Sequence, residues 1–288
     1  MPTTYAHWRF GDKCIKTLSE DLQNIINNNR EIFDFGVHGP DIFFYYNCIK
    51  KNDINKFGSN MHGVPFEETL EKMRPLYQKS NNKESLLSYL LGFLTHFTLD
   101  SYCHGFVELK AMKQNVGHLK IESQADRYFL IKDGYNPVKQ SATFSLKPNK
   151  KIASDIAELF PELNSEIVYK SLTDQVFYLN LIKDSNAIKR YFLNKLMIMA
   201  NADNFKQLLI TDVDEPICKD SNDRINKYMK VAVKHYPKLA KSLLAFLNDN
   251  KKLDKYFKNN FNHKDDYMKI PLLSYEEELK YEIKDFQK

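Results

Sequence analysis

Residues 86–104 read LLSYLLGFLTHFTLDSYCH, and this stretch decides the fold. Apolar residues occupy most sides of the helix that it would form, and a helix of that kind is usually central in its fold. The pattern begins at Lys83, and Gly105 is its expected stop. We therefore predict a central helix over 83–104.

Helical patterns recur along the rest of the chain. Pro65, followed by the acidic residues Glu67 and Glu68, suits the first turn of a helix over 65–79. Pro237 should break or kink the helix in which it falls. Residues 134–150 suggest a loop with room for a short strand, and they are the only plausible internal boundary. Further helices are expected over 117–131, 151–160, 163–184, 186–209, 222–248 and 274–286.

These segments predict an all-α fold. The chain has only 9 Gly and 10 Pro among its 288 residues, which favours long helices over many short strands. Short loops between amphipathic helices suit one bundle. We therefore expect a single multi-helix domain over residues 1–288, in which 250–288 form a charged C-terminal extension.

The charge and the composition exclude several classes of protein. The formal net charge of +5 is mild and spread along the chain, without the dense basic tract of a nucleic-acid-binding tail, so no stable nucleic-acid complex is expected. A weakly basic surface suits anionic substrates or lipid headgroups, although it can equally have no function. No run approaches the roughly 18 apolar residues of a transmembrane segment. The N-terminus lacks a secretory signal and the four cysteines are widely spaced, so we expect a cytoplasmic protein.

Three ionisable residues interrupt the central apolar stretch. His96, Asp100 and His104 are spaced by four, and residues four apart on a helix lie on the same face. A buried carboxylate between two imidazoles needs compensation, which a divalent cation supplies. A hydrogen-bonded polar network inside the core is an equally good interpretation of this motif alone.

A second spaced pair follows in the next expected helix. His118 and Glu122 are also four apart, and by itself such a pair is more often a surface contact. Beside the first motif, His104, His118 and Glu122 would supply three protein ligands with room for water, which is the pattern of an open zinc site.

Two further motifs precede the central helix. In His38-Gly39-Pro40-Asp41 the aspartate should start a helix, where capping is its ordinary role. His62 follows Met61 and should lie in a loop just before the helix at 65, where an ordinary surface histidine is the alternative.

Taken together, these motifs form a pattern that is more specific than any one of them. Their order and approximate spacing resemble the bacterial zinc-dependent phospholipase C family, which is related to single-strand-specific zinc nucleases. The similarity in ligand spacing covers residues 7–122, and beyond them it extends only to helical character. The residues that carry it are Tyr5-Ala6-His7-Trp8, Gly39-Pro40-Asp41, Met61-His62-Gly63, Thr95-His96-Phe97-Thr98-Leu99-Asp100-Ser101-Tyr102-Cys103-His104, and His118 with Glu122.

The resemblance implies an all-α fold with two or three clustered Zn²⁺ ions. Asp41, His62 and His96 would bind one ion, and Asp100 would bridge it to a second that His7 also holds. His104, His118 and Glu122 would hold the third. Asp41 is also the candidate general base. In secreted family members the N-terminus freed by signal cleavage is a metal ligand, and no cleavage signal is visible before His7 here. For the site shared by His7 and Asp100 the alternatives are therefore a vacant site and one completed by water or by another side chain.

The activity implied is that of a phosphoric diester hydrolase acting on a phosphodiester, with phospholipid and peripheral membrane contact among the possibilities. Some choline-specific members carry an aromatic residue directly after the metal-binding aspartate, whereas this chain has Ile42. The alternatives are a nuclease or nucleotidase with the same site and a non-catalytic protein with structural zinc. His38, His235 and His263 lie outside the pattern, and the last two are expected at the surface.

Overall fold

The all-α fold is confirmed by a computed structural model that describes residues 4–183, 187–199, 203–249, 251–262 and 267–283. Within these ranges the chain forms α-helices and short 3₁₀ helices and contains no strand. The loop at 134–150 consists of turns and extended segments, without the short strand for which it had room. None of the helices in the described ranges is both long and apolar enough to cross a bilayer.

The central helix, α6 (Lys83–Gln114), is buried along most of its 32 residues. It does not end at Gly105, as the sequence suggested, but continues to Asn115, which adopts a left-handed conformation. The apolar surface continues past the glycine, because Phe106, Val107 and Leu109 are all buried. Burial of these side chains outweighs the roughly 1 kcal/mol that a glycine costs inside a helix.

The N-terminal helices cover one side of α6. They are α1 (Thr4–Ile15), α2 (Glu20–Asn28), α3 (Arg30–Gly36) and the 3₁₀ helix η1 (Gly39–Tyr45). Gly36 and Gly92 allow α3 and α6 to approach closely: a Cβ on Gly36 would lie 2.4 Å from the carbonyl oxygen of Tyr89, and one on Gly92 would lie 2.5 Å from that of Phe33. This crossing brings η1 against the middle of α6.

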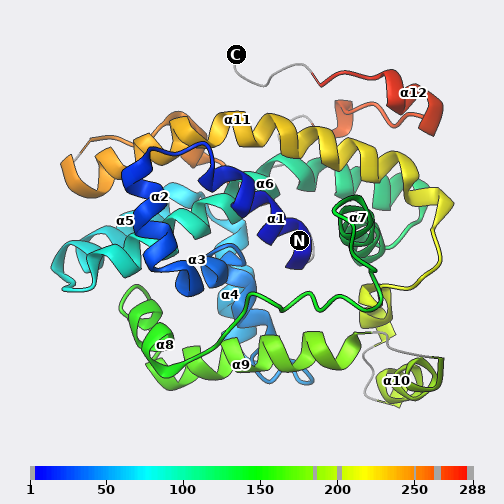
Figure 1. Ribbon diagram of the computed structural model, residues 1–288, viewed down its shortest axis with the longest axis horizontal. Helices are drawn as coiled ribbons and strands as arrows, with labels where there is room; N and C mark the ends of the chain where they lie inside the picture. The colour runs from blue at the N-terminus through cyan, green and yellow to red at the C-terminus, as the bar shows by residue number, and fades with distance from the viewer. Residues whose placement is uncertain (1–3, 184–186, 200–202, 250, 263–266, 284–288) are drawn as a thin grey trace.

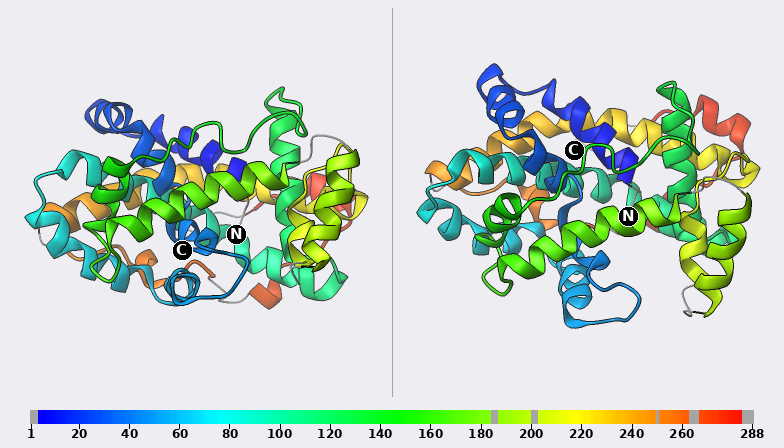
Figure 2. Two further views of the ribbon diagram at one scale, coloured as in Figure 1. Left: turned by 90° about the horizontal axis from the view of Figure 1, so that it is seen from below. Right: turned by 60° about the horizontal axis from the view of Figure 1, so that its bottom comes forward.

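Most of the remaining expected helices are present with small shifts at their ends. Pro65 caps its helix instead of opening it, and α8 and α9 follow the loop at 134–150. Helix α9 also packs against η1, and both further views show it crossing that region (Figure 2). The bounds are α5 (Phe66–Lys79), α7 (His118–Lys132), α8 (Lys150–Ala157) and α9 (Ser165–Ile182). Helix α4 (Asp53–Gly63), which precedes them, was not among the expected helices.

The C-terminal part is dominated by α11 (Lys219–Asp249), which packs along α6 on the edge of the molecule opposite α8 and α9 (Figure 1). Pro237 does not break this helix, because Tyr236, Leu239 and Ala240 beside it are fully buried. The single helix expected over 186–209 was wrong, since that region contains α10 and η2. The remaining elements are α10 (Ala187–Met199), η2 (Asp203–Leu208), η3 (Pro216–Cys218), η4 (Lys255–Lys258), η5 (Tyr267–Lys269) and α12 (Tyr275–Lys280).

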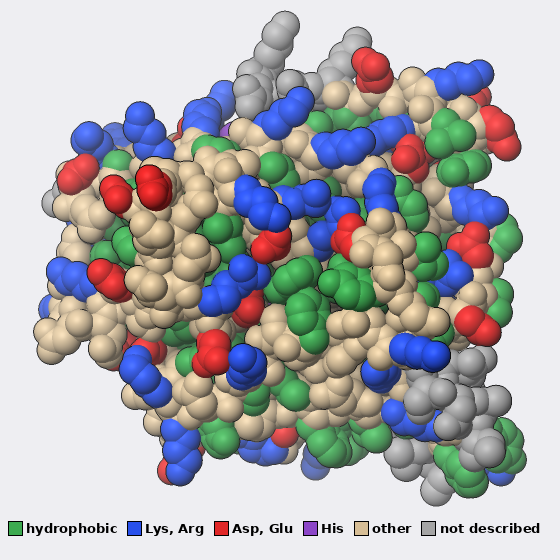
Figure 3. All heavy atoms as spheres, viewed as in Figure 1, with side chains coloured by type: hydrophobic (Ala, Val, Ile, Leu, Met, Phe, Trp, Pro, Cys, Tyr) green, Lys and Arg blue, Asp and Glu red, His purple; other side chains and the backbone are tan. Residues whose placement is uncertain are grey.

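The surface agrees with the sequence in the distribution of its charge. Lys and Arg side chains are spread among acidic ones over the face in Figure 3 and form no dense basic patch there. The expected helix over 274–286 ends at Lys280, and its last three positions, like His263, lie outside the described residues.

Candidate metal centre

The first group of potential metal ligands joins α1 to α6. His7 Nε2 lies 3.2 Å from Asp100 Oδ1, and His96 Nε2 lies 3.2 Å from Asp100 Oδ2. The imidazole rings of His7 and His96 stack with their centroids 4.2 Å apart. One ligand atom from each of these three buried residues lies within 4.8 Å of the others. The polar row expected on α6 therefore faces a histidine from the first helix.

The second group shares His96 with the first. Asp41 Oδ1 lies 3.0 Å from His62 Nε2 and 3.8 Å from His96 Nε2. Asp41 belongs to η1, whose first residue, Gly39, has a φ of 48°; a Cβ at Gly39 would also lie 2.6 Å from the His96 ring. His62 was expected in a loop but occupies the last turn of α4. The sequence did not anticipate that helix.

The third group lies at the other end of the row. His104 Nε2 is 3.4 Å from Asp100 Oδ2, which connects this group to the other two. His118, the first residue of α7, contacts Glu122 Oε1 through Nε2 at 2.7 Å and Glu108 Oε1 through Nδ1 at 3.0 Å. Ligand atoms of His104, Glu108 and His118 lie within 4.8 Å of one another. Glu108 was not singled out from the sequence.

Backbone carbonyl groups orient two of the imidazoles. His62 Nδ1 is 2.8 Å from the carbonyl oxygen of Gly58, and His96 Nδ1 is 3.2 Å from that of Val37. Because a carbonyl can only accept, each Nδ1 donates its proton, and in the neutral ring each Nε2 keeps a lone pair on the side of the carboxylates. This is the usual arrangement around metal-binding histidines.

A buried aspartate outside the predicted set positions α1. Asp126 of α7 accepts hydrogen bonds from the backbone N–H groups of Tyr5 and Ala6, at 2.9 and 2.7 Å. The first N–H groups of a helix have no partner inside the helix, so a carboxylate there fixes the helix start. Asp126 thereby holds His7, one residue further on, against α6. No spacing rule in the sequence pointed to this contact.

The charges in the centre shift several pKa values. Burial lowers the pKa of His7. Burial acts in the same direction on His96, but the carboxylates of Asp100 and Asp41 outweigh it and raise the pKa of that imidazole. For Asp100, burial opposes ionisation, yet the imidazoles of His96 and His104 hold its pKa well below the usual range. Asp100 is therefore an anion surrounded by imidazoles.

Several polar atoms that face one another in the first two groups lack hydrogen bonds. A buried polar atom without a partner costs about 1–3 kcal/mol, and more when it is charged. Imidazole nitrogen and carboxylate oxygen are the ligands that zinc prefers alongside thiolate, so these residues fit zinc ions that would satisfy all of them. Among the described residues the atoms concerned are His7 Nε2, Asp41 Oδ1, His62 Nε2, His96 Nε2 and both Asp100 carboxylate oxygens.

Among the histidines outside the three groups, one lies in a different environment from the one expected. His235 was expected at the surface, but it is buried and contacts the Tyr102 hydroxyl through Nδ1 at 3.0 Å, because α11 packs on α6 there. His38 is buried close enough to His7 and His96 for their charges, together with burial, to lower its pKa. Cys103, which precedes His104, is buried in the core.

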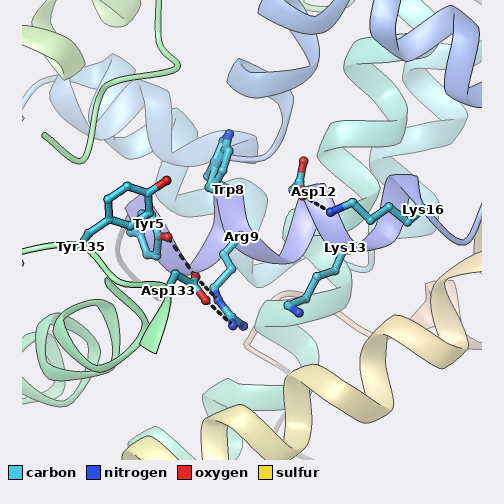
Figure 4. Close-up of a pocket in the computed structure, with 8 residues that line it drawn as sticks. All are labelled: Tyr5, Trp8, Arg9, Asp12, Lys13, Lys16, Asp133 and Tyr135. Atoms are coloured by element: carbon cyan, nitrogen blue, oxygen red, sulfur yellow. Dashed lines mark hydrogen bonds and ion pairs between the residues drawn. The ribbon is translucent and has the colours of Figure 1, made fainter. Parts of the chain in front are cut away.

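Some of the aromatic residues that are close in sequence to the potential ligands lie in the core, and one of them lies against a potential ligand. Phe10 and Phe43 are fully buried, whereas the Phe44 ring stacks on His62 with centroids 5.1 Å apart. A surface hollow beside α1 is lined by eight residues and includes none of the predicted ligands (Figure 4). Within it Arg9 is held by Asp133, to which its Nη2 donates at 2.8 Å.

Comparison with known proteins supplies the family. The model of the family described as zinc dependent phospholipase C matches residues 6–172, which is more than half of the chain. The chain belongs to this family. The matched range contains all three groups of potential ligands and ends within α9. Searches of curated proteins and of solved structures found no match.

Proposed function

We propose that this protein is a phospholipase C-like phosphodiester hydrolase with two or three zinc ions. The observation that carries the proposal is the continuity of the three ligand groups along α6. His96 belongs to the first two groups, and Asp100 lies within 3.4 Å of ring nitrogens of His7, His96 and His104. A structural zinc site needs one closed set of four ligands, whereas linked sets on one helix suit a multinuclear hydrolytic centre.

The ligand assignments are part of this proposal. Asp41, His62 and His96 would hold one zinc ion, and His7 would hold the second together with Asp100, a carboxylate that the first ion would share. His104, His118 and Glu122 would hold the third. When bound, the ions would polarise the phosphoryl oxygens, activate water and stabilise the leaving oxygen.

Contacts within the chain hold the side chains of the proposed catalytic centre in place. Asp41 is the proposed general base, which takes the proton from the attacking water. His62 is fixed by the Gly58 carbonyl and His96 by that of Val37, so neither can turn away from Asp41. Access from solvent is best at the third group, where the side chains of His118 and Glu108 are 24% and 40% exposed. The substrate would therefore approach from that end.

Phospholipid is the proposed substrate class, with a headgroup other than choline. Ile42 directly follows Asp41 and is fully buried in the core, so this position offers no aromatic face to a quaternary ammonium group. Contact with a membrane surface would be peripheral.

Product analysis with zinc-loaded protein tests the activity. Mixed micelles of several phospholipids, single-stranded DNA and a 3′-nucleotide would be compared under the same conditions. We expect diacylglycerol and a phosphorylated headgroup from at least one phospholipid. Hydrolysis of the nucleic-acid substrates alone would instead identify a nuclease or nucleotidase. Zinc binding without hydrolysis of any of them would favour a structural zinc protein.

A further inference from the structure

Helix α10 is apolar on the side that it turns to solvent. Leu193 and Met197, four residues apart, are buried and face the protein. The side chains of Phe192 and Ile198 are nevertheless 64% and 57% exposed, and Tyr191 is 55% exposed. A helix on the surface of a protein in water is expected to be polar on its outer side. Apolar side chains on both sides of α10 therefore indicate contact with something other than water.

Two further exposed apolar side chains lie on the same edge of the molecule. Ile49, in the segment between η1 and α4, is 69% exposed, and Phe177 of α9 is 59% exposed. The Asn47 backbone N–H donates to the Asp174 carboxylate at 2.9 Å, which holds this segment on α9. Phe177 follows Asp174 by three residues, so it leaves α9 on the same side.

The segment between η1 and α4, helix α9 and helix α10 share one edge of the protein. They lie along the lower edge in Figure 1, and the right view of Figure 2 brings that edge forward. We call the exposed apolar side chains on these three elements the apolar edge. They are Ile49, Phe177, Tyr191, Phe192 and Ile198.

Exposed lysines lie among the residues of the apolar edge. Lys50 and Lys51 are exposed in the segment 47–52, and the exposed Lys195 places its ammonium 4.6 Å from the centroid of the Tyr191 ring. Figure 3 shows basic side chains among hydrophobic ones at its lower edge. Neither the segment 47–52 nor α10 contains an aspartate or a glutamate. Aromatic and aliphatic side chains among lysines are typical of surfaces that enter the interface of an anionic membrane.

The carboxylates that flank the apolar edge are each paired with a lysine. Asp174 of α9 forms an ion pair with Lys170 at 2.9 Å. Asp53, the first residue of α4, forms one with Lys56 at 3.1 Å. These carboxylates therefore do not cancel the positive charge of the exposed lysines, and the edge favours a negatively charged surface.

The apolar edge is connected to the candidate metal centre at two places. The segment that carries Ile49 directly follows η1, which contains Asp41. Helix α10 packs against η2, and η2 packs against α7, whose first residue is His118. Ser123 of α7 also donates to the backbone carbonyl of Gln207 in η2 at 2.7 Å. A membrane on this edge would thus contact the elements that border the solvent-exposed end of the centre.

We propose that the apolar edge is the surface by which this protein docks on an anionic phospholipid bilayer. Its aromatic and aliphatic side chains enter the interface of the bilayer, and Lys50, Lys51 and Lys195 contact the lipid phosphates. This inference rests on the proposed function and deepens it, because it names the surface that brings a phospholipid to the metal centre.

Sedimentation with vesicles tests the docking surface. Zinc-loaded wild-type protein would be mixed with vesicles of phosphatidylcholine and phosphatidylserine, and with vesicles of phosphatidylcholine alone. We expect stronger binding to the mixed vesicles, and this binding should weaken as salt is raised, because salt screens the lysines. Phe192→Ser should weaken it by about 10- to 100-fold. The double variant Lys50→Gln with Lys51→Gln should weaken it by roughly 5-fold for each lysine.

The matched control removes an equally exposed apolar side chain from the opposite edge. Leu279 on α12 is 55% exposed, and α12 lies at the upper edge in Figure 1. Leu279→Ser should bind the mixed vesicles as wild type does. Equal binding by wild type, Phe192→Ser and the lysine variant, or no binding to any vesicle, would overturn the inference. A wild-type dimer in size-exclusion chromatography that Phe192→Ser abolishes, without vesicle binding, would assign the edge to a second copy instead.

Hydrolysis separates this inference from the proposed function. Phe192→Ser should slow hydrolysis of phospholipid in the mixed vesicles and leave hydrolysis of a soluble short-chain phospholipid unchanged. Equal loss on both substrates would overturn the inference, because the residue would then act on the centre itself. Vesicle binding that is lost in Phe192→Ser, in a protein that hydrolyses neither substrate, would support the docking surface and contradict the proposed activity.

Discussion

Two kinds of buried charge occur in this molecule, and they differ in how they are compensated. Along α11, Lys110 donates to both oxygens of Asp220 at 2.7 Å and to Gln114 at 2.8 Å, so its three protons all have acceptors. Arg224 donates to both oxygens of Glu278 at 2.6–3.0 Å. Each of these clusters contains its own counter-charge.

The second kind of buried charge lies in the ligand groups. Both oxygens of Asp100 face ring nitrogens of histidines at 3.2–3.4 Å, yet no hydrogen bond reaches them from any residue that the structure describes. Polar groups gathered in this way are costly unless a cation joins them. The difference teaches that buried charges paired with a counter-charge hold the fold together, whereas several imidazole nitrogens gathered around a buried carboxylate without hydrogen bonds to it identify the site.

Removing the negative charge from the buried Arg224–Glu278 pair should give the largest effect on stability. Glu278→Gln leaves the Arg224 guanidinium without its buried anion, which should cost about 3–5 kcal/mol of unfolding free energy. Zinc content should not change, because Glu278 contacts no member of the ligand groups. Urea unfolding and elemental analysis would measure the two quantities. Loss of zinc with unchanged stability would invalidate the distinction between the clusters.

The corresponding change in the ligand groups should affect activity and metal content. Asp100→Asn removes the carboxylate that lies within 3.4 Å of ring nitrogens of His7, His96 and His104, so at least one zinc ion should be lost and the hydrolysis rate should fall by roughly 10²–10³-fold. The metal-free protein should lose little stability, because the asparagine is uncharged. Asp53→Asn, at a 95% exposed side chain, is the control. Full activity in the Asp100→Asn protein would exclude the assigned role.

Zinc should stabilise the protein through the ligand groups alone. At a free zinc concentration about 100 times the dissociation constant, the expected gain is about 2.7 kcal/mol for each site. Thermal unfolding with and without chelator would show the shift in wild-type protein and a smaller one in Asp100→Asn. A shift of the same size in both would mean that zinc binds elsewhere.

The smallest expected effect concerns pH. Burial holds the pKa of His38 well below its usual value of 6.5, so this group stays neutral in the folded state. Below pH 6.5 the unfolded chain binds the proton that the folded chain does not, and stability should fall by up to about 1.4 kcal/mol per pH unit. His38→Gln should reduce the slope measured on metal-free protein between pH 7.5 and 5. An unchanged slope would show that His38 titrates normally.

The sequence predicted the helical class and the row of His96, Asp100 and His104 on one face of α6, because both follow from local periodicity. It missed the continuation of α6, since the packing of Phe106 and Leu109 overrides the local signal at Gly105. That error also hid Glu108, which lies one turn beyond His104 on the same helix. Asp126 could not be found because its contact with α1 joins residues more than 100 positions apart. The single-domain organisation stays a prediction.

Metal content tests the central claim most directly. Zinc would be counted by elemental analysis on protein purified without chelator and without a metal-binding tag. Two or three ions per chain are expected if the clustered histidines and carboxylates form a multinuclear centre. No zinc, even after zinc is added back, would contradict the account and leave these residues as a polar network within the core.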